Sequence, residues 1–185
     1  MEDTEMNASM EKLNALKKET AELQKKGLPY MMASVIIWGL ILLVRLLVRD
    51  LRTANILTFC AACLLMPAAW NFSKLVKADI FRKTKNPVSA LALLCTLNQF
   101  LYILIVMWAF DRSPQAMVMI HAMVFGAHLL PFSWIYDSKP YLVFSIVESV
   151  GALVIGSLWG GTYVAAFIFC IQIIFSSILY KDCGR

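Results

Sequence analysis

The chain has 185 residues, of which 60% are hydrophobic and only 16% are charged, and its formal net charge is +5. Its mean hydropathy is +0.70, whereas about a quarter of the residues in a soluble domain are charged. This composition excludes an ordinary soluble enzyme and predicts an all-α, polytopic membrane protein.

Six segments are long and apolar enough to cross a bilayer, which takes about 20 mostly apolar residues in a helix. Hydropathy and polar, Pro or Gly breaks place them at residues 30–48, 53–72, 88–110, 114–131, 141–159 and 161–180. The links between them are short and leave no room for a soluble catalytic domain. We therefore expect two parts: an amphipathic cytoplasmic segment over 1–29 and a six-helix transmembrane domain over 30–185.

The N-terminal segment is predicted to form a short amphipathic helix ahead of the first span. Ser9 is a candidate N-cap, and Gly27 and Pro29 are expected to end the helix. Apolar or small residues recur at heptad-like spacing over Leu13, Leu16, Thr20 and Leu23. This stripe allows a homo-oligomer or a membrane-protein partner to bind through residues 9–26, but a helix on the membrane surface is the favoured interpretation.

The distribution of lysine and arginine predicts that both termini are cytoplasmic. In a six-span arrangement most of these residues fall on the side of the termini, and cytoplasmic loops carry such an excess. The opposite, outer side holds Arg45, Arg49, Arg52 and Arg112. Arg45 and Asp50 are interpreted as an exposed pair at that interface.

Four consecutive spans carry polar side chains near the expected middle of the bilayer. They are Asn98 and Gln99 on the third span, His121 on the fourth, Glu148 on the fifth and Gln172 on the sixth. One ionisable group at that depth costs on the order of 3 kcal/mol, so such groups face the bundle interior and find partners. The pattern predicts a shared polar layer. It serves either as a site for an ion or small solute, the interpretation favoured at Glu148, or as interhelical hydrogen bonding, the one favoured for the amides.

His121 and His128 are the only two histidines. Seven residues return a helix to nearly the same face about 10.5 Å along its axis, so the pair cannot bind one metal ion. Without a third histidine, a bis-histidine haem within one chain is also excluded, and we expect no metal and no cofactor. The spacing fits a line of two proton-accepting groups, although a histidine bonded to a nearby hydroxyl or carbonyl is the commoner case.

The chain has five cysteines, and Cys60 and Cys63 form a CxxC motif. This pair is a redox candidate for a membrane thiol oxidoreductase. The motif falls inside the second span, away from a helix N-terminus that would activate a thiol, so a packing role is favoured. Pro67 is expected to kink the same span near its inner end.

Three stretches resemble a bacterial integral-membrane family known only as a domain of unknown function. They are YMMASVIIWG (30–39), CLLMPAAWNFSKLVK (63–77) and NPVSALALLCTLNQFLYILIVMW (86–108). The resemblance covers the first three spans. It implies a multi-pass protein of the bacterial inner (cytoplasmic) membrane and brings no catalytic residues.

The predicted function is a small transporter or channel-like protein for a small solute or ion, with proton coupling left open. Its substrate or proton site would comprise Glu148, His121, His128, Asn98, Gln99 and Gln172. One alternative is a non-catalytic regulatory or assembly subunit, and another is the thiol oxidoreductase. The expected surroundings are the lipid bilayer, no nucleic acid is expected to bind, and an enzyme is the less favoured class.

Overall fold

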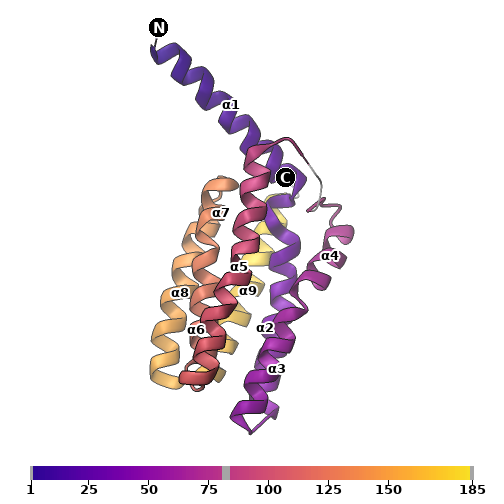
Figure 1. Cartoon of the computed structure of the whole chain (residues 1–185). Coiled ribbons are helices and arrows are strands. Elements are labelled where there is room, and N and C mark those ends of the chain that lie inside the picture. Colours follow the sequence, from indigo (N-terminus) through magenta and orange to yellow (C-terminus); the bar gives the residue numbers. More distant parts are fainter. Residues whose placement is uncertain (1, 81–83, 184–185) are drawn as a thin grey trace.

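The computed structural model describes residues 2–80 and 84–183 (Figure 1). Within these ranges every regular element is helical, which confirms the predicted all-α class. The elements are α1 (Glu2–Leu23), η1 (Lys25–Gly27), α2 (Leu28–Leu47), α3 (Leu51–Cys63), α4 (Leu65–Leu75), α5 (Pro87–Arg112), α6 (Met117–His128), α7 (Leu130–Ile135), α8 (Lys139–Trp159) and α9 (Gly161–Cys183).

Among the described residues, six helical segments are long and apolar enough to cross a membrane, which confirms the predicted number. They are Lys25–Leu47, Leu51–Leu75, Pro87–Arg112, Met117–Ile135, Lys139–Trp159 and Gly161–Cys183. The fourth differs most from its prediction, because it begins at Met117 and continues beyond Pro131. Proline is tolerated in the first turn of a helix, and Pro131 occupies that position in α7.

Apart from the η1 turn at the start of the first span, two of the six spans are broken, and both of these breaks precede a proline. The second span breaks at Leu64, ahead of Pro67, and the fourth breaks at Leu129, ahead of Pro131. Proline lacks an N–H and clashes with the preceding turn, so the chain tightens there: Leu64 N–H donates to the Ala61 carbonyl over 3.0 Å. The kink predicted from Pro67 is therefore present, but near the middle of the span rather than at its inner end.

The helices form an upright bundle with both ends of the chain at the same end of it, here called the terminal end (Figure 1). α2 packs on α9 and α4, α6 packs on α8, and α8 packs on α9. The core between them includes the fully buried side chains of Trp38, Tyr141, Ile168 and Phe175. α5 lies at the edge, where it packs mainly on α6, and only 11% of its most apolar stretch is buried.

α1 extends beyond the bundle at the terminal end, with its second half anchored on α5 (Figure 1). Thr20 Oγ1 lies 2.9 Å from Ser89 Oγ, and Asn86 Nδ2 donates to the Leu16 carbonyl over 2.8 Å. Part of the heptad-like stripe is thus used within the chain. Ser9 is not the N-cap, because the helix already includes Glu2 and the Ser9 hydroxyl donates to the Glu5 carbonyl one turn earlier.

The link between α1 and α2 is a short turn with left-handed residues rather than a simple helix end. Gly27 has φ +71°, a left-handed conformation that costs little without a Cβ. A Cβ there would lie 2.8 Å from Tyr141 Oη, so the close approach also requires glycine. Pro29 begins α2 instead of ending α1, because its fixed φ suits the first helical turn.

Candidate functional site

The polar residues predicted at mid-depth separate into two groups instead of forming one layer. Glu148 and Gln172 belong to a sealed hydrogen-bonded chain, whereas Gln99, His121 and His128 line a pocket. Asn98 is half-buried on α5 and belongs to neither.

The sealed group joins α8, α9 and α2 and is here called the Glu148 chain. Gln172 Nε2 donates to Glu148 Oε1 over 2.7 Å, and Ser34 Oγ lies 2.6 Å from Gln172 Oε1. Glu148 and Gln172 are 0% exposed and Ser34 is 1% exposed, so water does not reach them. Ser34 was not predicted from the sequence, because a serine that bonds its own preceding turn is common inside a membrane helix.

The hydrogens of the Glu148 chain can be counted. Ser34 Oγ lies 2.7 Å from the Met31 carbonyl as well as 2.6 Å from Gln172 Oε1, and both of these oxygens only accept. A hydroxyl has a single hydrogen and can serve only one of them. A half-turn of the Gln172 amide gives each of these three bonds its own hydrogen: Nε2 donates to Ser34, Ser34 donates to Met31, and Glu148 donates to Gln172 Oε1. That arrangement requires Glu148 to carry a proton. The other carboxyl oxygen, Glu148 Oε2, has no partner among the described residues in either orientation.

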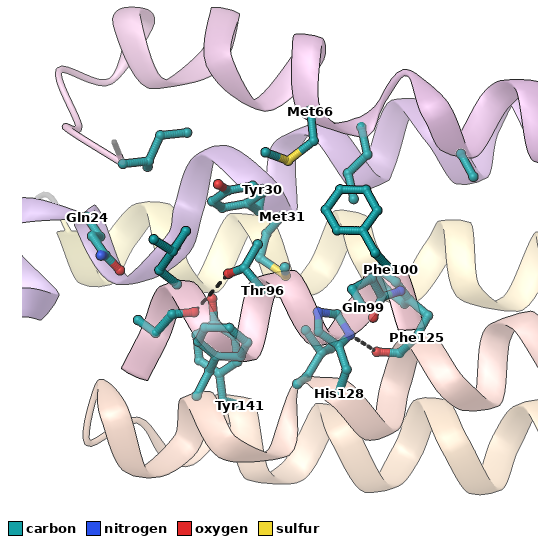
Figure 2. Close-up of a pocket in the computed structure, with 18 of the residues that line it drawn as sticks. Gln24, Tyr30, Met31, Met66, Thr96, Gln99, Phe100, Phe125, His128 and Tyr141 are labelled. Atoms are coloured by element: carbon teal, nitrogen blue, oxygen red, sulfur yellow. Dashed lines mark hydrogen bonds between the residues drawn. The ribbon is translucent and has the colours of Figure 1, made fainter. Parts of the chain in front are cut away.

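The second group surrounds a cavity of about 220 Å³ between α2, α4, α5 and α6, here called the pocket (Figure 2). Its walls are mainly apolar, with Met31, Met66, Phe100, Phe125 and Leu129 among them. No Lys, Arg, Asp or Glu of the described chain lines it. The cavity exceeds the roughly 150 Å³ that holds benzene in an engineered protein core.

Two polar atoms at the pocket are buried and have no hydrogen-bond partner in the described part of the chain. They are Gln99 Oε1 and His121 Nδ1. His121 is only 8% exposed, and its ring centroid lies 5.4 Å from that of Trp38. Leaving such an atom unpaired costs about 1–3 kcal/mol, so these two atoms mark where a bound molecule would gain hydrogen bonds.

His128 differs from His121, although both line the pocket. Its Nδ1 pairs with the Phe125 carbonyl, as Figure 2 shows. Since a carbonyl only accepts, Nδ1 carries the hydrogen and Nε2 is left as an acceptor when the ring is neutral.

The fourth span is centred near Gly126 rather than near residue 122. His121 therefore lies about 7.5 Å from the middle toward the end opposite the termini, at 1.5 Å per residue.

Two tyrosines close the pocket at the terminal end. Tyr141 Oη donates to the Lys26 carbonyl over 2.6 Å, and Tyr136 Oη donates to Gln24 Oε1 over 2.7 Å. Both tyrosines line the pocket and are buried. Neither tyrosine was predicted as a site residue, because the placement of the η1 segment beside them has no local signal in the sequence.

The pocket opens at the side of the bundle. Leu93 and Phe100 line it although they are 47% and 52% exposed on α5, and exposed Cys63 lines it from the end of α3. α5 packs on α6, α7 and α1, whereas α4 packs on α2 and α3. The opening therefore follows the seam between these two sets of helices, on the apolar surface that faces lipid.

The remaining candidates lie elsewhere. Cys60 and Cys63 are free thiols on the exposed surface of α3, and no cluster of three or more metal-ligating side chains occurs among the described residues. The predicted Arg45–Asp50 pair is wrong. Arg45 Nη2 donates instead to Asn55 Oδ1, because α3 turns back beside α2, and Asp50 caps α3 by accepting from Thr53 N–H over 2.7 Å.

Comparison with curated proteins and with solved structures finds no match. The pattern of a family of unknown function (DUF7010) matches residues 13–182. The match begins in α1 and ends in α9, so it covers all six spans and not only the three that carry the resemblance seen in the sequence. The chain belongs to this family of unknown function, DUF7010.

Proposed function

We propose that this protein is a small transporter or channel-like protein whose solute site is the pocket. The observation that carries the proposal is the pair of unpartnered polar atoms, Gln99 Oε1 and His121 Nδ1, in an otherwise apolar cavity. Polar groups are expensive inside a membrane and typically mark a substrate or ion pathway. Sites near the middle of the bilayer are also typical of transporters.

The Glu148 chain supports a proton-coupled form of this proposal. Met31 connects the two groups, because its carbonyl accepts from Ser34 and the residue also lines the pocket. A carboxylate without a cationic partner is costly in hydrocarbon, so Glu148 is neutral at rest in this proposal. Loss of its proton would turn the Gln172 amide and change the bond that Ser34 makes at the pocket wall.

The coupled form is tested with purified protein in liposomes that contain a pH-sensitive dye. After a pH gradient is imposed, wild type should dissipate it faster than protein-free liposomes, and Glu148→Gln should lose this activity. Glu22→Gln, at an exposed position on α1, is the matched control and should behave as wild type. A Glu148→Gln rate equal to an active wild-type rate contradicts the role of Glu148, and an inactive wild type contradicts proton coupling.

For orientation, we propose that both termini are cytoplasmic and that the protein lies in the inner membrane of a bacterium. Lysines at the terminal end support this, and the positive-inside tendency applies to such short connections. They include Lys25, Lys26, Lys74, Lys77 and Lys139. A green fluorescent protein fused after residue 185 should fluoresce and an alkaline phosphatase fused there should be inactive; the reverse pattern contradicts the orientation.

A second candidate is a non-catalytic regulatory or assembly subunit, in which the Glu148 chain only holds helices together. The first half of α1 favours it, because this half projects from the bundle with Met6 and Met10 exposed. Deleting residues 2–12 spares the contacts of Leu16 and Thr20 with α5. Under this candidate the deletion should abolish a homo-oligomer or partner complex, as measured by native mass spectrometry, while proton flux stays at the level of empty liposomes.

The arrangement of Cys60 and Cys63 does not favour a thiol oxidoreductase.

A further inference from the structure

We infer that the pocket binds an uncharged, lipid-soluble molecule of about one ring in size that carries a hydroxyl or N–H donor and arrives from the side of the bundle. This inference rests on the proposed function, because it names the class of solute for the same pocket. Four observations carry it: the volume of the pocket, its charge, its unpaired acceptor and the direction in which it opens.

The volume limits the size of the ligand. A cavity of about 220 Å³ exceeds the roughly 150 Å³ that takes up benzene. It is smaller than the pockets of about 300–1,000 Å³ that enclose drug-sized ligands. A single substituted ring therefore fits, and a larger fused-ring compound does not.

The lining selects an uncharged ligand. The described residues around the pocket include no Lys, Arg, Asp or Glu that could pair with an ion, and burying an unpaired ion is very costly. Phe100, Phe125 and Phe132 supply aromatic walls, which pack well against a ring.

The unpaired atoms select a donor. Gln99 Oε1 can only accept a hydrogen bond, and His128 Nε2 is an acceptor when its Nδ1 bonds the Phe125 carbonyl. Figure 2 shows Gln99 and His128 at the same end of the pocket, near Phe100 and Phe125. A hydroxyl or N–H group placed at this end satisfies an acceptor that has no partner among the described residues.

The route by which a ligand enters follows from the pocket being closed at the terminal end and open at the side of the bundle. The bonds from Tyr141 to Lys26 and from Tyr136 to Gln24 close the terminal end. Leu93, Phe100 and Cys63 are exposed at the side while they also line the pocket. A molecule dissolved in the bilayer can therefore reach the pocket between α4 and α5 without passing through water.

The donor requirement is tested with phenol and toluene, which share a ring and differ in the hydroxyl. Binding to the purified full chain in detergent is measured as the rise in Tm with ligand concentration. Gln99→Met should weaken phenol binding at least about threefold, the equivalent of one lost hydrogen bond, and leave toluene binding unchanged. Asn98→Leu, at the neighbouring position outside the pocket, should change neither. Phenol and toluene partition differently into detergent. The binding of each ligand is therefore compared only between wild type and variants, and not with the binding of the other ligand.

The route is tested by alkylation with N-ethylmaleimide. Saturating phenol should slow the modification of Cys63, which lines the pocket, and leave Cys60, which is exposed on the same helix outside it, unaffected. Ala62→Phe should fill the pocket and abolish the protection. If phenol binds without protecting Cys63, access between α4 and α5 is refuted.

The remaining outcomes separate this inference from the proposed function. If Gln99→Met weakens phenol and toluene equally, or weakens neither, the donor requirement is overturned while the pocket stands as a solute site. If a phospholipid remains bound to wild type in native mass spectrometry and is lost in Ala62→Phe, the occupant is a lipid chain and the inferred class is overturned. If neither probe binds wild type, the proposed solute site itself fails, whatever the liposome assay of Glu148 shows.

Discussion

The Glu148 chain and the pocket lie in the same bundle, and Met31 contributes to both. They differ in the surroundings of their polar side chains, which are sealed from water in the Glu148 chain and lie beside a cavity at the pocket. In the Glu148 chain, Gln172 bonds Glu148 and Ser34 in a space that admits no water, and Glu148 Oε2, which has no partner among the described residues, does not face the pocket. At the pocket, Gln99 lies at a similar depth on α5, and its oxygen has no partner among the described residues and lies beside a cavity. A polar residue at mid-depth therefore does not define a site by itself, and an unpaired atom next to open space is the more informative feature.

The largest difference between the two regions is expected in how tightly their side chains pack. Two leucine substitutions, one beside the Glu148 chain and one at the pocket, measure this difference as a loss of stability. A Cβ on Gly126 would lie 2.8 Å from Glu148 Cβ and 2.7 Å from Ser149 Oγ. Gly126→Leu should therefore push α6 away from α8 and cost about 3 kcal/mol or prevent folding. Ala62→Leu extends into the pocket and should cost less than about 1 kcal/mol. Equal losses in thermal denaturation would show that the pocket side is packed as tightly as the other.

The two glutamines allow the same chemical change on each side of the comparison. Gln172→Met removes the partner of both Glu148 and Ser34 and should destabilise the protein by about 1–3 kcal/mol. Gln99→Met replaces an oxygen that has no partner in the described chain and should leave stability unchanged or raise it. Denaturation midpoints of both variants check this. If Gln99→Met lowers stability and Gln172→Met does not, the description of Gln172 as bonded and Gln99 as unpartnered is contradicted.

The tyrosine closure of the pocket should contribute less than the Glu148 chain. Tyr141→Phe keeps the ring and removes one hydrogen bond to the Lys26 carbonyl, so a loss of about 0.5–1.5 kcal/mol is expected. Tyr180→Phe, at an exposed position on α9, is the control and should have no effect. Amide hydrogen exchange around Gly27 should also speed up in Tyr141→Phe, and unchanged exchange would mean that the closure does not depend on this bond.

The smallest effect is expected at Asp50, which lies far from both regions and outside the spans. The bond from Thr53 to the Asp50 carboxylate lowers the pKa of Asp50. The stability that the ionised Asp50 carboxylate adds to the folded protein is fully present above the unfolded pKa, about 3.9. It is lost as the pH falls through the lower folded pKa. Acidification below about pH 4 should therefore narrow a small difference in Tm between wild type and Asp50→Ala. A difference that widens on acidification would contradict the cap.

How far the sequence predicts the candidate site differs from residue to residue. Gln99, His121 and His128 were named as candidates for the substrate or proton site and line the pocket, whereas Asn98, named with them, lies outside both groups. A helix of apolar residues on every side does not reveal which face turns inward. For this reason the sequence did not show which of the two adjacent amides on α5, Asn98 or Gln99, reaches the pocket.

The sequence alone determined the class, the number of spans and the presence of a kink in the second span. These follow from hydropathy over about 20 residues and from the missing N–H of proline, which are local properties. Only the tertiary structure decided that Ser34 completes the Glu148 chain, that Arg45 pairs with Asn55 and that a cavity opens between α4 and α5. Those features depend on how each helix is rotated and which neighbour it packs against, and no single segment of the chain encodes them.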